Sequence, residues 1–264
     1  MPDISPDSKS VMTALFLFAH QDDEVAAFHC IEKEWHLGRR VICCFLTDGG
    51  FGGASPQVRS QESLAVLTRL GVAPEDVRFI GASAGIRDQH LHESIDQAYA
   101  TLRESTASFL ENIETIYAPA WEGGHPDHDA THLMARRLTS SLSQKCSIWQ
   151  FPLYHAENCP GPFFKVLSPL KNNGPVFNEY IPWRKRWQYL VFASTLYPSA
   201  RKTWLGLTPF FAYHYLVHGV QSLQRADQVL CRPHSGRLYY EKRGFASFDE
   251  FWVATAAFHG PQEN

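Results

Sequence analysis

Side chains of the kinds that bind metal ions are concentrated near the start of the chain, in the run AHQDDE at residues 19–24. A histidine, two aspartates and a glutamate so close together are costly to bury unless a positive charge offsets them, and a metal ion is the simplest such charge. A single aspartate would be explained by helix capping alone, but the whole group exceeds what a cap needs. Taken by itself, the run is equally consistent with a metal site and with a structural role.

A second run of ionisable residues, WEGGHPDHD, occupies residues 121–129. Each of its histidines, taken alone, is explained as an ordinary loop residue. Together with His20 and Asp23 from the first run, His128 would complete a set of two histidines and one carboxylate, which suits zinc with a fourth position open to water. His132 lies four residues after His128, on the same face of the expected helix, and is a rival ligand that we place second.

Both runs follow apolar stretches that we interpret as buried strands, at residues 11–19 and 113–118. Helical patterns follow at residues 25–37 and 130–142. In open α/β sheets, ligands bind at the carboxyl ends of the strands. Two such ends can meet in space although about a hundred residues separate them in sequence.

Strands and helices alternate through the first 151 residues, and this alternation predicts a mostly parallel sheet with right-handed crossovers. We therefore expect an α/β, Rossmann-like three-layer fold with strand order 3-2-1-4-5, numbered along the chain. In this order strands one and four are neighbours, so the two polar runs meet. The remaining strands are expected at 40–46, 77–80 and 147–151, and the remaining helices at 56–70 and 95–111.

The first run resembles the AHPDDE motif of the GlcNAc-phosphatidylinositol de-N-acetylase family, the PIG-L or LmbE-like zinc deacetylases, and residues 122–129 resemble its HPDH motif. The departure is Gln21, where the family usually has proline. The resemblance covers roughly residues 12–149 and implies roles for seven residues. These are His20, Asp23 and His128 as ligands of one zinc ion per chain, Asp22 as general base, His125 as the group that, when protonated, stabilises the oxyanion, and Glu24 and Asp127 as supports of the ligands. For Glu24, capping of the following helix is the alternative.

Two further residues are substrate candidates through the same resemblance. Arg59 begins an Arg-x-x-Glu pattern that recurs in the family and is a candidate for contact with a substrate hydroxyl or phosphate, although a surface ion pair with Glu62 is the usual outcome of such a spacing. Asp88 lies in a segment similar to the family's loop in which an aspartate binds sugar hydroxyls. The alternative for Asp88 is an aspartate that merely forms a turn.

The activity that the resemblance implies is hydrolysis of an N-acetyl group from an N-acetylated amino sugar, of the N-acetylglucosamine type, or from its conjugate. The expected partner is thus a small N-acetylated sugar. Three alternatives stay open: a zinc amidase acting on a larger acyl or thiol-conjugated substrate, a phosphoester hydrolase with a second metal ion, and a non-catalytic sugar-binding module.

The bulk composition of the 264 residues fits one domain over residues 1–264 in an ordinary protein of the cytoplasm. A net charge of −3 gives no reason to expect nucleic acid as a partner. The six cysteines form no CxxC pair and are expected to be reduced. Residues 1–10 are expected to be a flexible lead-in without a signal peptide, and no apolar run is long enough to span a bilayer.

The composition changes after residue 151, because 24 of the 35 aromatic residues lie at or after Trp149. We interpret residues 152–264 as a family-variable part that covers the site, with helices at 184–194 and 209–221 and an edge hairpin at 237–243. Basic residues at 184–186 and 201–202 would suit an anionic leaving group such as a nucleotide, lipid phosphate or acidic sugar. We favour the simpler interpretation of a solvated basic face.

Overall fold

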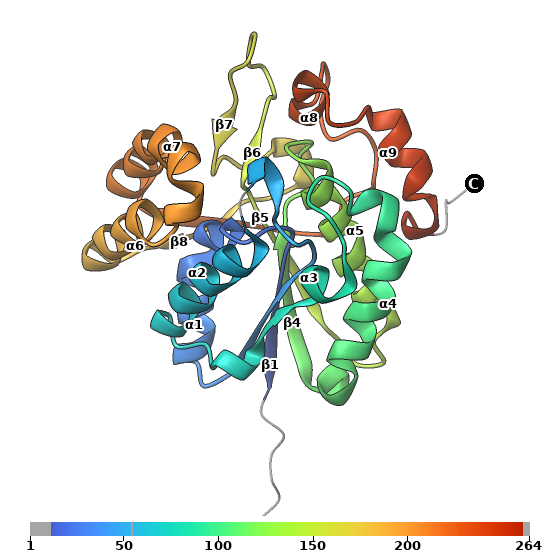
Figure 1. Cartoon of the computed structure of the whole chain (residues 1–264), viewed down its shortest axis with the longest axis horizontal. Coiled ribbons are helices and arrows are strands. Elements are labelled where there is room, and N and C mark those ends of the chain that lie inside the picture. The colour runs from blue at the N-terminus through green and yellow to red at the C-terminus, as the bar shows by residue number, and fades with distance from the viewer. Residues whose placement is uncertain (1–11, 54, 261–264) are drawn as a thin grey trace, which may run out of the picture.

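The computed structural model describes residues 12–53 and 55–260, and its centre is a seven-stranded sheet in the order β3-β2-β1-β4-β5-β9-β8 (Figure 1). The predicted order 3-2-1-4-5 is confirmed, and those five strands are parallel. Two antiparallel strands that were not predicted, β9 and β8, extend the sheet. The strands are β1 (Thr13–Phe18), β2 (Arg40–Phe45), β3 (Val77–Phe79), β4 (Ile113–Pro119), β5 (Ser147–Phe151), β8 (Phe177–Tyr180) and β9 (Val220–Arg225).

Helices cover both faces of this sheet, which explains why every residue of β1 is buried. Phe16 and Phe18 point into one apolar cluster and Leu15 and Leu17 into the other, as the alternation of a strand requires. The first cluster is built with α1 (Phe28–His36), α2 (Pro56–Arg69), α6 (Trp183–Thr195) and α7 (Arg201–Tyr213). The second is built with α3 (Ile80–Ala84), α4 (Ile95–Thr106), α5 (Pro126–Ser141) and α9 (Phe248–Ala254).

The helices after the two polar runs begin differently from what the sequence pattern predicts. The segment expected to be helical from residue 25 starts as a 3-10 turn, Asp23–Ala27, before α1. Helix α5 begins at Pro126, four residues earlier than predicted, because proline suits the first helical position and the His125 ring accepts the N–H of Asp127 as a cap. His128 therefore lies in the first turn of α5.

The helix expected at 184–194 is confirmed as α6, but two other predictions in the last third of the chain differ from the structure. The helix expected at 209–221 is instead α7 with Pro209 inside it, followed by a π-helical turn, His214–His218, and then β9. Pro209 cannot donate to the carbonyl of Leu205, but both residues are exposed, so water can serve that carbonyl. The hairpin expected at 237–243 is a short helix, α8 (Tyr239–Arg243).

The C-terminal part also forms a small antiparallel pair, β6 (Tyr154–His155) and β7 (Lys165–Val166), beside α7 and α8 in Figure 1. Because β8 and β9 join the main sheet, we keep the prediction of one domain. The expected lead-in at 1–10 lies outside the described residues. Among the residues that are described, no helix is both long and apolar enough to cross a membrane.

The backbone of Gly81 packs closely against the backbone of Thr47, in the segment that follows β2. A Cβ atom at Gly81, in α3, would lie 2.2 Å from the Cα atom of Thr47 and 2.3 Å from its nitrogen. Thr47 in turn donates its hydroxyl hydrogen to the carbonyl oxygen of Ala19 at 2.7 Å. The absence of a side chain at Gly81 therefore helps to fix the loop next to the first polar run.

We expect Gly81→Ala to lower the free energy of unfolding by about 1 to 3 kcal/mol, because backbone atoms must move to admit the methyl group. The matched control is Gly206→Ala in α7, where no neighbouring atom lies within 4 Å of the new Cβ. That change should raise the free energy of unfolding by roughly 0.5 to 1 kcal/mol through helix propensity. Urea denaturation measures both, and an undisturbed Gly81→Ala variant would contradict the close packing.

Candidate metal centre

Three of the predicted ligand residues come together where β1 and β4 end. His20 and Asp23 follow β1, and His128 stands in the first turn of α5, after β4. The Nε2 atom of His128 lies 3.1 Å from Asp23 Oδ1, and the Nδ1 atom of His20 lies 3.6 Å from Asp23 Oδ2. All three are buried, and their ligand atoms lie within 4.8 Å of one another. The group could hold a metal ion.

Asp23 is held in place by backbone hydrogen bonds. Its Oδ2 atom accepts the N–H groups of Ala19 at 3.0 Å and His20 at 2.8 Å. Burial on its own would raise the pKa of Asp23, but the charges and hydrogen bonds of His128 and His20 hold that pKa well below its usual range. An ionised carboxylate between two imidazoles is a donor set suited to a divalent cation.

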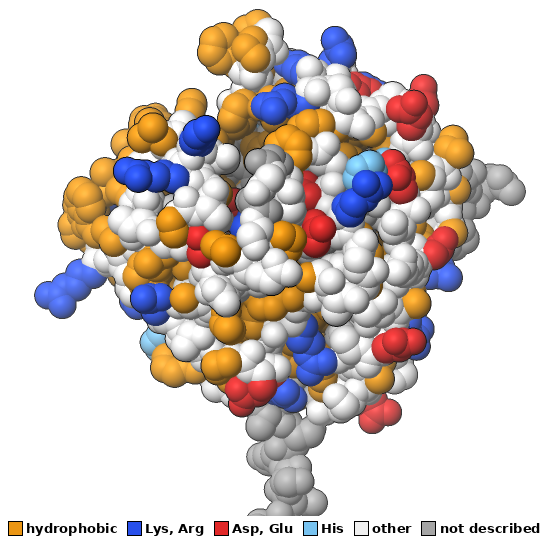
Figure 2. Space-filling model, viewed as in Figure 1, with side chains coloured by type: hydrophobic (Ala, Val, Ile, Leu, Met, Phe, Trp, Pro, Cys, Tyr) orange, Lys and Arg blue, Asp and Glu red, His pale blue; other side chains and the backbone are white. Residues whose placement is uncertain are grey.

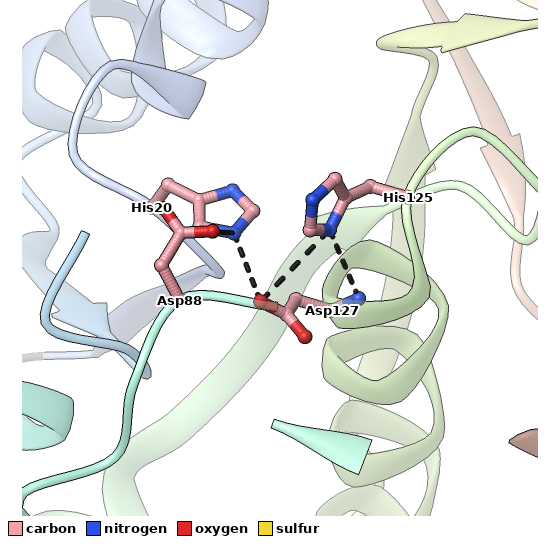
Figure 3. A group of neighbouring side chains, drawn as sticks. All are labelled: His20, Asp88, His125 and Asp127. Carbon is pink, nitrogen blue, oxygen red and sulfur yellow. Dashed lines mark hydrogen bonds and ion pairs between the residues drawn. The ribbon is translucent and has the colours of Figure 1, made fainter. Parts of the chain in front are cut away.

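Asp127 contacts both His20 and His125, as the dashed lines in Figure 3 show. Its Oδ2 atom lies 3.0 Å from His20 Nε2 and also accepts the N–H of Gln89 at 2.6 Å, while Oδ1 accepts the N–H of Leu91 at 3.0 Å. Burial opposes ionisation, yet the hydrogen bond and charge of His20 and the N–H of Gln89 lower the pKa of Asp127 to about 2. Such a carboxylate fixes the ring orientation of a histidine ligand.

Asp88 also reaches the site from the loop after α3. Its Oδ1 atom lies 3.4 Å from His20 Nε2 and its Oδ2 atom 4.0 Å from Arg59 Nη1. The Oδ1 atom of Asp48 accepts the Asp88 N–H at 3.0 Å, which positions the loop. His20 and Asp88 belong with His125 and Asp127 to a second group that could hold a cation (Figure 3).

Asp22 has a left-handed backbone, with φ of 111°. Both its backbone N–H and its carboxyl group have a partner. Its N–H donates to Glu24 Oε2 at 2.9 Å, and its Oδ1 atom lies 3.0 Å from Arg59 Nη2. Burial raises the pKa of Asp22 to about 6, although the Arg59 guanidinium opposes this. Glu24 thus supports the backbone of Asp22 rather than a ligand, and its other oxygen accepts the Tyr197 hydroxyl at 2.9 Å.

Arg59 is buried and does not form the surface ion pair with Glu62 that was the simple alternative. Besides Asp22, its guanidinium donates to the carbonyl oxygens of Gly49, at 2.6 Å, and of Gln21. Glu62 instead accepts the backbone N–H of Ser199 at 2.9 Å. Arg59 therefore joins three segments around Asp22.

His125 lies on the opposite side of the site and is arranged as a neutral ring. Its Nδ1 atom accepts the N–H of Asp127 at 3.2 Å, so the ring proton belongs on Nε2. Burial, together with the charge of His20, lowers the pKa of His125 well below its usual range. The protonated ring that the resemblance suggested is therefore not favoured, but Nε2–H can still donate a hydrogen bond.

Tyr154 is a site residue that the sequence pattern did not identify. Its ring centroid lies 5.3 Å from that of His128, and no described residue hydrogen-bonds its hydroxyl. The backbone of Tyr154 is fixed by Glu122, whose Oε1 atom accepts the N–H groups of Leu153 and Tyr154, both at 2.7 Å. The signal was present, because Tyr154 follows β5, the strand next to β4, and so obeys the same strand-end rule.

His132, the rival ligand, belongs to the core. Its Nδ1 atom lies 3.0 Å from the carbonyl oxygen of Pro119, and its Nε2 atom lies 3.4 Å from the side-chain nitrogen of Gln228. Burial lowers the pKa of His132 to about 3. It joins neither group of potential ligands among the described residues.

Comparison with protein families gives one match. Residues 15–139 match the family model described as PIG-L: GlcNAc-PI de-N-acetylase. No curated protein sequence matches the chain at a significant level. The matched segment contains every side chain that the two motifs predicted for the site.

Several solved structures share the fold. The zinc-inhibited form of teicoplanin deacetylase Orf2 is 16% identical with a TM-score of 0.56, over 82% of this chain and 99% of that one. The N,N'-diacetylchitobiose deacetylase from Pyrococcus horikoshii, in complex with its inhibitor MPG, is 18% identical (TM-score 0.54, 82% and 83%). GalB, the 4-carboxy-2-hydroxymuconate hydratase from Pseudomonas putida KT2440, is 14% identical (TM-score 0.52, 84% and 98%). Because this fold carries different reactions, the reaction has to be argued from side chains.

We expect Asp127→Asn to weaken metal binding by about 10- to 100-fold, because the amide no longer offers His20 a charged partner. The amide oxygen of the substituted side chain can still accept one backbone N–H, so the fold should persist. The matched control is Glu93→Gln, which neutralises an exposed carboxylate beside His90. Competition with a chelating dye measures the affinity for Zn²⁺, and an unchanged affinity in a folded Asp127→Asn protein would contradict this role.

Proposed function

We propose, from the premise that residues 15–139 form a PIG-L domain, that the chain is a metal-dependent hydrolase that removes the N-acetyl group from an amino sugar or its conjugate. The observation that carries this proposal is the meeting of His20, Asp23 and His128 beside Asp22, at adjacent strand ends. Deacetylases among the proteins of the same fold, one of them named for N,N'-diacetylchitobiose, support an N-acetylated sugar as substrate.

The charges around His20 suit a cation. Asp22, Asp23, Asp88 and Asp127 are four carboxyl groups in one buried region, and Arg59 faces two of them, Asp22 and Asp88. We propose that His20, Asp23 and His128 hold one zinc ion per chain. When bound, such an ion lowers the pKa of a water molecule and polarises an amide carbonyl group.

Asp22 is our candidate for the residue that moves the proton. We assign it as the base that takes a proton from the attacking water and delivers it to the amine nitrogen as the carbon–nitrogen bond breaks, which leaves acetate and a free amine. Arg59 keeps the carboxylate of Asp22 oriented, and Glu24 accepts a hydrogen bond from the backbone N–H of Asp22. Arg59 thereby has a positioning task in addition to the substrate contact that we predict for it.

His125 and Tyr154 face the reacting carbonyl in this proposal. The neutral His125 ring donates from Nε2–H to the carbonyl oxygen as negative charge develops on it. The Tyr154 phenol keeps its proton, because burial and the charges of Asp23 and Asp22 raise its pKa well above the usual value. It is therefore a second hydrogen-bond donor. We assign Asp88 to a sugar hydroxyl.

The location and the alternatives also remain proposals. The six free cysteines support a cytoplasmic location. An amidase acting on a larger acyl or thiol-conjugated substrate would use the same residues. A phosphoester hydrolase would need a second cation, for which the group of His20, Asp88, His125 and Asp127 is the candidate, and two zinc ions per chain would favour it.

The test is acetate release from a panel of free, lipid-linked and nucleotide-linked N-acetylated sugars, with and without chelator. We expect release from at least one member, loss of activity with chelator and recovery with added Zn²⁺. Asp22→Asn should retain its metal but lose at least about 100-fold in turnover, because it removes the base.

The same panel carries larger acyl amides and phosphoesters as comparison substrates. Acetate release that continues after exhaustive removal of metal would contradict the metal-dependent mechanism. Normal turnover by Asp22→Asn would show that another residue is the base. If only the larger amides are hydrolysed, the protein is an amidase and the proposed deacetylase activity is wrong.

We expect Tyr154→Phe to lower kcat by about 10- to 100-fold with little change in KM, because the lost hydroxyl acts on the charge that develops in the transition state. The control is Tyr213→Phe, since the Tyr213 ring is exposed on α7. Steady-state kinetics on the active substrate measure both parameters. A rise in KM with unchanged kcat would assign the hydroxyl to ground-state binding instead.

A further inference from the structure

The segment that forms α6, α7 and β9 has an unusual charge distribution. Residues 180–226 contain six Lys and Arg residues and no Asp or Glu, whereas the whole chain has a formal charge of −3. The rest of the chain therefore carries a formal −9. Where such cations are exposed, they can attract an anionic partner to a protein of negative net charge.

The same segment exposes apolar side chains. Of the eighteen large hydrophobic side chains that are exposed among the described residues, eight lie between residues 180 and 217. On α6, Trp183, Trp187 and Val191 recur at every fourth position, so they share one side of the helix. On α7 and the turn after it, Leu205, Tyr213 and Val217 are 60% to 80% exposed.

Basic side chains border these apolar ones. Arg184 is exposed at the start of α6, and Arg201 and Lys202 are exposed at the start of α7. Lys185 is engaged elsewhere, by Glu32 at 2.5 Å, and Arg186 is buried and stacks on Tyr180. In Figure 2, hydrophobic and basic side chains are interspersed on the side of the molecule where α6 and α7 lie.

We propose that this α6–α7 face docks on the surface of an anionic lipid bilayer. Exposed tryptophan and aliphatic side chains enter the headgroup region, while Arg184, Arg201 and Lys202 pair with lipid phosphates. A nucleic acid would pair with the cations but would leave the apolar side chains of Val191, Leu205 and Val217 in water. A symmetric dimer through this face would bring two positive segments together, which costs energy.

The docking face continues into the wall of the candidate site. Phe210, half exposed on α7, has its ring centroid 6.2 Å from that of Phe164 in the β6–β7 hairpin. Phe164 lies 5.9 Å from Tyr154, and Tyr154 lies 5.3 Å from His128. A protein docked in this way presents the side of its site lined by Tyr154 toward the bilayer.

Co-sedimentation with vesicles tests the proposal on the full chain. We expect binding to phosphatidylcholine vesicles that contain about 30% phosphatidylglycerol, weak binding to phosphatidylcholine alone, and weaker binding in high salt. Leu205→Glu and the double variant Arg201→Glu/Lys202→Glu should each reduce binding at least about 10-fold. Val253→Glu is the matched control, because Val253 is 76% exposed on α9, outside the segment.

Circular dichroism and hydrolysis of a water-soluble N-acetylated sugar should be unchanged in all these variants. Trp187→Ser, a smaller change, replaces Leu205→Glu if that variant does not fold. The proposal is overturned if anionic vesicles do not bind the protein, or if both face variants bind them like the control. It is equally overturned by binding to RNA or DNA in place of vesicles, or by a dimer that Leu205→Glu dissociates without any vesicle binding. Vesicle binding is measured without substrate, so its outcome is separate from that of the deacetylase test.

Discussion

The parallel pairing of β1 with β4 holds the candidate site together. Phe16 is paired with Tyr117 in the register of the two strands, and their rings stack at a centroid distance of 4.5 Å. Because β1 is buried on both faces, its end cannot shift against β4 without disrupting both apolar clusters. Asp23 and His128 are 105 residues apart in sequence and meet through this pairing.

Carboxylates that accept backbone N–H groups give the loops above the sheet their shape. Asp23 binds the turn that contains it, Asp127 binds the loop after Asp88, and Glu122 binds the corner after β5. Each bond offsets part of the cost of burying a polar carboxyl group and removes freedom from a loop that lacks a core of its own. The same acids then present His20 and Tyr154 in fixed orientations, which is the preorganisation that a catalytic site requires.

Apolar runs and the residues after them were enough to predict the parallel strands and the meeting of His20 with His128. The partners of Arg59 could not be predicted, because a spacing of three suggests Glu62 while the tertiary fold supplies Asp22. Tyr154 was missed because it is one of 22 aromatic residues in the C-terminal part, and only packing against His128 distinguishes this one. The helix expected at 184–194 matches α6, whereas the bounds of the helix around Pro209 and the short segment at 237–243 were predicted wrongly, because the local pattern is ambiguous there and neighbouring elements decide.

The backbone of Asp22 limits what evolution can place there. Glycine, asparagine and aspartate adopt a backbone φ of 111° far more readily than glutamate does. The two natural carboxylic acids are therefore not interchangeable at this turn, whatever their similarity in acidity. Relatives that had abandoned catalysis would be expected to carry asparagine or glycine at this point, since either preserves the turn after the function is gone.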